Sequence, residues 1–304
     1  MGDPRTRATG PKDARPAFLD TPIEESLGLH ARRDPADLEE DFGYRFYVDV
    51  LGLEHVHYGL WAGEELTLAG FRVAQQRYAE ALADLFPEGI VSVLDVGCGT
   101  GANAAGFVTR GYEVEGLSPD PYHGRLFGQA TGLPFHECKF EEFRPARRYD
   151  VICMSESSQY ISLDRLFESV VHAVKPGGYL ILSDYFALVK DGSPATKSGH
   201  LLSAFLAAAE KSGMKIEYER DVTNETAPTL DLGCQLLDGY IVPTVRLTME
   251  RWRLRHRRLL SLGLWLVRRY LENVEARKET LDSRVFREKK TYRMYRFRAP
   301  VPVA

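Results

Sequence analysis

Between residues 90 and 184 the chain alternates short apolar runs with stretches of helical character. Runs typical of buried strands occupy 90–96, 112–117, 134–140, 149–154 and 179–184, and further strands are predicted at 215–222 and 291–297. Because each intervening helix must cross one face of a sheet before the next strand begins, this alternation predicts an α/β fold. We expect a doubly wound, mostly parallel sheet.

Helical segments flank this alternating core on both sides. Residues 1–36 are rich in Pro, Arg and Asp, and we expect a mobile tail there, followed by an N-terminal helical lid over 37–86. The core occupies 87–222, a helical lid insertion 223–283, and a closing strand with the C-terminus 284–304. Ligands of open α/β sheets bind beyond the carboxyl ends of the strands, so the lids are expected to cover that edge.

Composition narrows the class of protein. The 304 residues carry 39 Lys and Arg against 43 Asp and Glu, a balance that does not suggest nucleic-acid binding. Residues 250–298 are locally basic, with 16 Lys and Arg against 6 Asp and Glu, so contact with a membrane surface stays open. Four widely spaced cysteines, and no apolar run long enough to span a membrane, favour a cytoplasmic protein without a metal site. The oligomeric state stays open.

A glycine-rich turn joins the first strand of the core to its first helix. Gly97, Gly99 and Gly101 follow Asp95, which lies within the strand. Glycines at this place let the backbone turn sharply and approach a ligand closely, and the start of the next helix offers unpaired N–H groups. Dinucleotide binding requires the spacing G-x-G-x-x-G, whereas here the third glycine comes one residue early. The spacing therefore argues against a nicotinamide cofactor.

The stretch from Val93 to Gly101 resembles, almost letter for letter, the first motif of the class I S-adenosylmethionine-dependent methyltransferases. The turn at 175–178 resembles the family's L-x-P-G-G turn, with Val174 where Leu is usual. The segment 57–61 resembles small-molecule and lipid methyltransferases, such as the tocopherol, sterol and cyclopropane fatty-acid synthase groups. The resemblance implies a Rossmann-like core with helical elaborations, and S-adenosylmethionine as the cofactor.

The resemblance also implies residues that hold the cofactor. Gly97, Gly99 and Gly101 would pass beside its methionine and ribose parts, and Asp95 would bond its ammonium group or the turn backbone.

The end of the second strand departs from the family pattern. Ser118 stands where the family usually carries an acid that grips the ribose, and Asp120 or Glu115 is an alternative partner. The other candidate cofactor residues follow the third and fourth strands: Phe140, Glu141 and Ser155.

Methyl transfer from a sulfonium needs mainly proximity and in-line orientation, with a base where the acceptor must lose a proton. We expect His57, in the aromatic loop ahead of the core, or the Tyr160 hydroxyl to handle that proton. The acceptor pocket is expected to be lined by aromatic and acidic residues near the strand ends: Tyr58, Trp61, Asp184, Tyr185 and Tyr240. Such a pocket favours a small hydrophobic or amphiphilic acceptor, methylated on C, O or N.

Two other functions stay open. A cofactor-binding regulatory protein without catalysis is compatible with Ser118 in place of the usual acid. A nucleic-acid methyltransferase could use the basic 250–298 region, although no Asn-Pro-Pro-Tyr-type motif follows the fourth strand.

Overall fold

The computed structural model of the protein describes residues 44–255 and 279–301, in two units that we treat separately, residues 44–50 and residues 51–301. In the first unit the short π-helix η2 spans Phe46–Val50. The predicted tail at 1–36, the start of the predicted lid at 37–43 and part of the predicted lid insertion at 256–278 lie outside the described residues.

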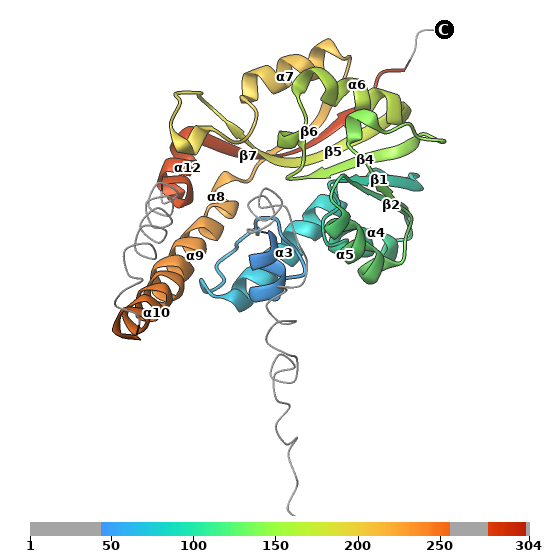
Figure 1. Cartoon of the computed structure of the whole chain (residues 1–304). Helices are drawn as coiled ribbons and strands as arrows, with labels where there is room; N and C mark the ends of the chain where they lie inside the picture. The colour runs from blue at the N-terminus through green and yellow to red at the C-terminus, as the bar shows by residue number, and fades with distance from the viewer. Residues whose placement is uncertain (1–43, 256–278, 302–304) are drawn as a thin grey trace, which may run out of the picture. The chain divides into compact units, whose positions relative to one another are not determined.

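Seven strands form one sheet in the order β3-β2-β1-β4-β5-β7-β6. Neighbours among β1 to β5 pair in parallel, whereas β7 runs antiparallel to both β5 and β6. The predicted doubly wound, mostly parallel sheet is therefore confirmed (Figure 1). The strands are β1 (Ser92–Val96), β2 (Glu113–Ser118), β3 (Phe135–Glu137), β4 (Tyr149–Ser155), β5 (Val174–Ala187), β6 (Lys215–Asp221) and β7 (Lys290–Arg298).

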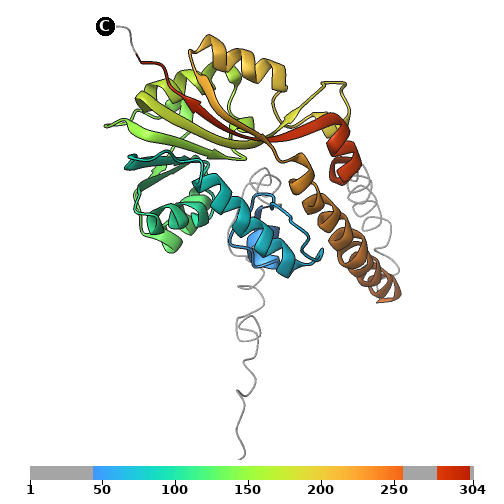
Figure 2. The same ribbon diagram turned by 180° about the vertical axis from the view of Figure 1, so that it is seen from behind.

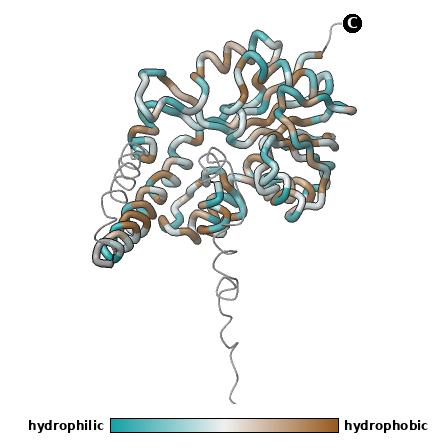
Figure 3. Tube along the Cα trace, in the orientation of Figure 1, coloured by the Kyte–Doolittle hydropathy of each residue, from teal (hydrophilic) through white to brown (hydrophobic). Residues whose placement is uncertain are grey.

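Helices cover both faces of this sheet, as the front and rear views show (Figures 1 and 2). One apolar core includes Tyr78 and Leu82, and the other includes Phe167 and Phe205. Apolar stretches occur both in the strands and in the helices (Figure 3), and buried apolar residues of both form the cores. The first face carries α3 (Leu68–Ala83), α4 (Ala102–Thr109) and α5 (Pro121–Thr131), and the second carries α6 (Leu163–Ala173) and α7 (Leu202–Lys211).

Further helices follow β6. The helices α8 (Thr223–Thr226), α9 (Pro228–Leu236), η6 (Leu237–Ile241) and α10 (Val242–Arg255) succeed one another, and α12 (Ser283–Lys289) leads into β7. The predicted lid insertion is thus helical where it is described. The segment predicted as a closing strand with the C-terminus, 284–304, begins with a helix, because α12 extends to Lys289. The Asp282 carboxylate caps α12 by accepting from the Arg284 and Val285 N–H groups. No helix in the described ranges is long and apolar enough to cross a membrane.

The third strand is shorter than predicted. β3 ends at Glu137, and the chain then forms the 3-10 helix η3 (Phe140–Glu142). Phe140 is 3% exposed and packs with Phe143 in one of the two apolar cores. Burial of these rings therefore turns the chain away from the sheet edge before residue 140.

The predicted turn at 175–178 is a bulge inside β5. Tyr149 of β4 pairs with Val174, and two residues later Val151 pairs with Tyr179, so four residues are looped out. A Cβ atom on Gly178 would lie 2.7 Å from the Asp150 carbonyl oxygen. The bulge therefore needs glycine at this position.

The helix predicted at 67–86 is α3, which packs against the sheet as part of one helical layer. The loop 51–62 ahead of it reaches the strand ends. The Tyr58 N–H donates to Glu156 Oε1 at 2.7 Å, and the Trp61 N–H donates to the Glu225 carbonyl oxygen at 2.9 Å.

Candidate active site

The carboxyl ends of the central strands meet at one edge of the sheet. Val96 of β1 pairs with Leu117 of β2 and with Met154 of β4. Ser155 at the end of β4 pairs with Ser183 of β5. Residues that follow these positions therefore converge on one region, although they are far apart in the sequence.

The glycine-rich turn after β1 has the left-handed backbone that glycine adopts most easily. The φ angles of Gly97, Gly99 and Gly101 are +75°, +55° and +85°. The Gly97 N–H donates to the Leu117 carbonyl oxygen at 2.7 Å, and a Cβ atom on Gly97 would lie 2.3 Å from Ser157 Cβ. The predicted turn is thus built on glycine and brings main-chain atoms to the strand ends.

Asp95 places a carboxyl group directly beneath this turn. The residue is 2% exposed, and its Oδ2 atom has no hydrogen-bond partner in the part of the chain that the structure describes. Burial raises the pKa of Asp95 to about 7. An unpaired buried acceptor is costly, which suits an atom whose partner is a bound cationic or donor group.

Ser118 ends β2 with its hydroxyl at the same edge. Its Oγ atom lies 2.9 Å from His123 Nδ1 and accepts from the Asp120 N–H at 3.3 Å. Asp120 itself caps α5, accepting from the Tyr122 N–H at 2.8 Å. Of the residues suggested for the ribose, Ser118 and Asp120 therefore lie together at the end of β2.

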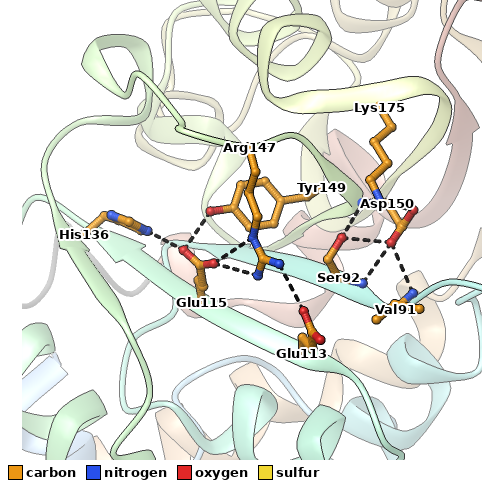
Figure 4. Close-up of polar contacts among 9 residues, drawn as sticks. All are labelled: Val91, Ser92, Glu113, Glu115, His136, Arg147, Tyr149, Asp150 and Lys175. Carbon is orange, nitrogen blue, oxygen red and sulfur yellow. Dashed lines mark hydrogen bonds and ion pairs between the residues drawn. The ribbon is translucent and has the colours of Figure 1, made fainter.

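Glu115, the other suggested ribose partner, belongs to a separate cluster (Figure 4). Its carboxylate accepts from Arg147, from Tyr149 Oη at 2.8 Å and lies 2.7 Å from His136 Nε2. Although burial raises it, hydrogen bonds from His136, Tyr149 and Arg147 together lower the pKa of Glu115. These contacts tie β2 to β3 and β4, so we assign Glu115 a structural role.

We expect Glu115→Gln to leave the affinity for S-adenosylmethionine unchanged but to lower the free energy of unfolding by about 1–2 kcal/mol at pH 7. The loss should shrink as the pH falls, because the native carboxylate has a lowered pKa and its stabilisation disappears once it is protonated. Chemical denaturation at pH 7 and pH 4, with calorimetry of the cofactor, measures both. Weaker cofactor binding by Glu115→Gln would indicate that Glu115 bonds the ribose.

Glu156 follows β4 and is held in an unusual position. Its φ of +54° makes it the one described residue other than glycine with a left-handed backbone. Its Oε1 atom accepts from the Tyr58 N–H at 2.7 Å and from Tyr292 Oη at 2.6 Å. Burial, with the nearby Asp184 charge, raises the pKa of Glu156 to about 8, and the two donors only partly offset this effect. A carboxyl with these properties suits proton transfer near neutral pH.

Tyrosine hydroxyls connect this carboxyl to the neighbouring strand end. Tyr292 Oη lies 3.0 Å from Tyr78 Oη, and Tyr78 Oη lies 3.0 Å from Ser155 Oγ. Ser155 therefore forms part of the Glu156 network.

Asp184 contributes a second acid after the middle of β5. It is 1% exposed and accepts from Ser158 Oγ at 2.7 Å and from the Tyr185 N–H at 2.8 Å. Burial raises the pKa of Asp184 to about 6. Asp184 thus adds negative charge near Glu156 without being hydrogen-bonded to it.

Aromatic rings surround the Glu156 carboxyl. The Tyr58 ring lies 6.2 Å from Tyr185, 6.0 Å from Phe286 and 5.6 Å from Tyr292, measured between centroids. Tyr58 and Tyr185, both predicted to line the acceptor pocket, are therefore brought together beside the acid.

His57 is packed inside the loop 51–62. It is 5% exposed, its Nδ1 donates to the Tyr58 carbonyl oxygen at 2.7 Å, and its ring stacks on Tyr78 at 4.0 Å. Burial, and to a smaller degree the neighbouring His55, lower the pKa of His57 to about 3. The imidazole is therefore a weak base, and the contacts make His57 a residue that fixes the loop.

Three other predicted residues differ from the acid cluster in burial or in contacts. Tyr160 lies near Glu156 and Asp184 but is 81% exposed, and Tyr240 is 66% exposed. Trp61 is buried, stacks on Phe71 and donates from Nε1 to Thr229 Oγ1 at 2.9 Å. Trp61 therefore anchors the loop to α9 instead of lining an open pocket, and Tyr160 lacks the enclosed surroundings that proton transfer favours.

The candidate adenine residues are also separated. Phe140 is enclosed in the core, whereas Glu141 is partly exposed beside it on η3.

Thr229 accepts two hydrogen bonds that hold the loop 51–62, from the Gly59 N–H at 3.1 Å and from Trp61 Nε1. We expect Thr229→Val to lower the free energy of unfolding by about 2–3 kcal/mol, because two buried donors lose their acceptor. Thr248→Val, on the exposed part of α10, is the matched control and should change it by less than about 0.5 kcal/mol. Equal midpoints in urea for the two variants would contradict the anchoring role.

A family model matches the part of the chain that includes the glycine turn. Residues 69–234, more than half of the chain, match the family model of a methyltransferase domain. The protein belongs to this methyltransferase family, and its glycine turn and sheet are those of the S-adenosylmethionine-dependent class that its first motif resembles.

A curated relative matches only part of the chain. The ubiquinone biosynthesis O-methyltransferase of Rickettsia prowazekii (strain Madrid E) is 28% identical over 99 residues, which are 31% of this chain and 39% of that protein. The alignment thus spans well under half of the relative's length.

Solved structures share the fold over most of their length. The [4+2]-cyclase SpnF superposes with a TM-score of 0.64 at 19% identity, covering 86% of this chain and 95% of that chain. Geranyl diphosphate C-methyltransferase from Streptomyces coelicolor A3(2) gives a TM-score of 0.60 at 18% identity, covering 88% and 100%. At these identities the likeness shows the fold alone.

Proposed function

We propose that this protein transfers the methyl group of S-adenosylmethionine to a small hydrophobic or amphiphilic acceptor. The observation that carries the proposal is a pair of buried carboxyls at adjoining strand ends. Asp95 lies unpaired beneath a glycine turn, and Glu156 is fixed by two donors among aromatic rings. Membership of the methyltransferase family supports the type of reaction.

The residues at the end of β1 and β2 fit the cofactor. The Asp95 carboxylate would bond its ammonium group, because Oδ2 is buried and has no partner among the described residues. The turn at Gly97 and Gly99 would let the backbone lie against it, and Ser118 would bond the ribose. When bound, the cofactor supplies an electrophilic methyl group on a sulfonium. The chain's own task is then to position the acceptor and handle its proton.

Glu156 replaces His57 in the proton-acceptor role that we predicted from sequence. Its raised pKa lets the carboxylate take a proton near pH 8, and the Tyr58 N–H and Tyr292 Oη fix the direction of its oxygen atoms. The positive φ of Glu156 stores strain of the kind that accumulates at functional sites.

The aromatic surroundings of Glu156 support an acceptor with an apolar body. Tyr58, Tyr185 and Phe286 offer ring faces beside the acid. The printed names of similar proteins, ubiquinone biosynthesis O-methyltransferase and geranyl diphosphate C-methyltransferase, also point to acceptors of this kind. A small-molecule partner and a cytoplasmic location complete the proposal.

One of the solved structures with a similar fold is a [4+2]-cyclase. The experiment that tests the proposed function must therefore follow the transfer of the methyl group itself. Purified protein is incubated with trideuteromethyl-labelled S-adenosylmethionine and a panel of prenylated phenols, prenyl phosphates and unsaturated fatty acids. We expect one panel member to gain a trideuteromethyl group, with S-adenosylhomocysteine formed one for one, as read by mass spectrometry. Cofactor binding without transfer to any member would favour the alternative of a cofactor-binding protein.

A further inference from the structure

A buried lysine lies one aromatic ring away from Glu156. Lys290 begins β7 directly after α12 and is 7% exposed. Its ammonium nitrogen lies 4.4 Å from the centroid of the Tyr185 ring. Tyr185 in turn lies next to Tyr58 and Tyr292, the two residues that hold the Glu156 carboxylate. Lys290 therefore faces the same aromatic surroundings as the candidate acid.

Lys290 forms no ion pair with a carboxylate in the ranges 44–255 and 279–301. Its Nζ atom donates to Ser198 Oγ at 2.9 Å. An ammonium group has three donors, so two N–H bonds are left without an acceptor there. Burying a cation in this way is costly unless an anion completes its surroundings.

Two neighbouring lysines, Lys190 after β5 and Lys289 at the end of α12, have acceptors for their ammonium groups, which sets Lys290 apart. Lys190 Nζ donates to the carbonyl oxygens of Thr196 and Gly199, both at 2.7 Å. Lys289 Nζ pairs with Asp191 at 3.1 Å and donates to Ser193 Oγ at 3.0 Å. These two lysines fix the loop that carries Ser198.

The electrostatics around Lys290 favour an incoming anion. Burial, and then repulsion by Lys190, lower the pKa of Lys290 to about 8, although Asp184 partly opposes the shift. The ammonium is still mostly protonated at pH 7, and its hydrogen-bond partner Ser198 is exposed. An anion placed beside Nζ would gain charge-assisted hydrogen bonds from the two unused donors.

We propose that Lys290, with Ser198, binds a carboxylate or phosphate group of the methyl acceptor while the aromatic rings hold its apolar body. This subsite rests on the proposed function and narrows the acceptor class to anionic amphiphiles. The reacting atom then lies on the Glu156 side of Tyr185, and the anionic group lies on the Lys290 side.

Three eight-carbon probes test the subsite: octyl phosphate, octanoate and octanol. Each is titrated calorimetrically into the full chain saturated with S-adenosylhomocysteine at pH 7. We expect at least one anionic probe to bind about tenfold more tightly than octanol. The ratio of octyl phosphate to octanoate affinity shows which anion the subsite prefers.

Variants of Lys290 and Ser198 then show whether these residues bind the anionic group of the probe. Lys290→Met should weaken binding of the preferred anion about tenfold without changing octanol, and Lys290→Arg should retain most of the affinity. Lys197→Met removes an exposed lysine of the same loop and is the matched control. Ser198→Ala, a small change at an exposed position, should weaken anion binding about threefold.

The outcomes separate the two proposals. Equal affinities for octanol and both anions, or anion binding that Lys290→Met leaves unchanged, would overturn the anionic subsite while the cofactor site stands. Failure of S-adenosylhomocysteine to bind the native chain would instead overturn the proposed function.

Discussion

Glu156→Gln is expected to lower kcat by about a hundred- to ten-thousandfold, the range over which a positioned base contributes to catalysis. The affinity for S-adenosylmethionine should stay within twofold, because Glu156 contacts Tyr58 and Tyr292 and not the glycine turn. Native kcat should rise with pH through about 8, as the carboxyl loses its proton, and the variant should lose this step.

Tyr292→Phe adds an independent test of the same carboxyl. The Tyr292 hydroxyl donates to Glu156 and stabilises its ionised form, so its removal should move the rise of kcat to higher pH. Glu225→Gln, which removes a surface carboxylate paired with Arg220, is the control and should leave the profile unchanged. Full kcat in Glu156→Gln, or an unshifted profile in Tyr292→Phe, would show that another group takes the proton.

Asp95→Asn is expected to weaken binding of S-adenosylmethionine about 30- to 100-fold, because the cofactor ammonium loses a charged partner. The same change should raise the stability of the cofactor-free variant, relative to the native chain, as the pH rises. The native carboxyl has a pKa raised to about 7, so folding favours its protonated form. Its contribution to stability is therefore present at pH 4 and is lost as the pH rises toward 7.

Denaturation of the cofactor-free proteins across this pH range measures the second effect. The difference in unfolding free energy between Asp95→Asn and the native chain should move in favour of the variant between pH 4 and pH 8. The shift should be on the order of 2–4 kcal/mol. Asp231→Asn, the same change on α9, is the control variant. Native affinity in Asp95→Asn, with no pH trend, would remove Asp95 from the cofactor site.

Local patterns were sufficient to predict the sheet and the glycine turn. Strands β1 and β4 are short, mostly apolar runs, and β2 and the closing strand β7 were also predicted from the sequence. β3 ends earlier than predicted because Phe140 is buried in an apolar core and does not lie at the sheet edge. This burial depends on tertiary packing, which local sequence patterns do not show.

The residue that takes the proton of the acceptor could not be predicted from local sequence patterns. A histidine in an aromatic loop has an ordinary pKa near neutrality, which favoured His57, but burial moves its pKa to about 3. The signal for Glu156 was only its position after a strand. Its two donors lie 98 and 136 residues away, and its left-handed backbone has no mark in the sequence.

Lys290 and Trp61 illustrate the same limit. The partner of Lys290 is Ser198, 92 residues earlier, and the partner of Trp61 is Thr229, 168 residues later. In the sequence, Lys290 is one of many basic residues in its segment, and Trp61 resembles a residue that lines a pocket. Long-range contacts decide whether such a side chain is buried, paired or exposed.

A crystal structure of the native chain with S-adenosylhomocysteine would show where the cofactor binds. We expect the ligand ammonium within hydrogen-bond distance of Asp95 Oδ2, its ribose beside Ser118, and its sulfur on the side of the strand edge where Glu156 lies. A ligand bound elsewhere, with Asp95 Oδ2 still unpartnered, would rule out the proposed cofactor site.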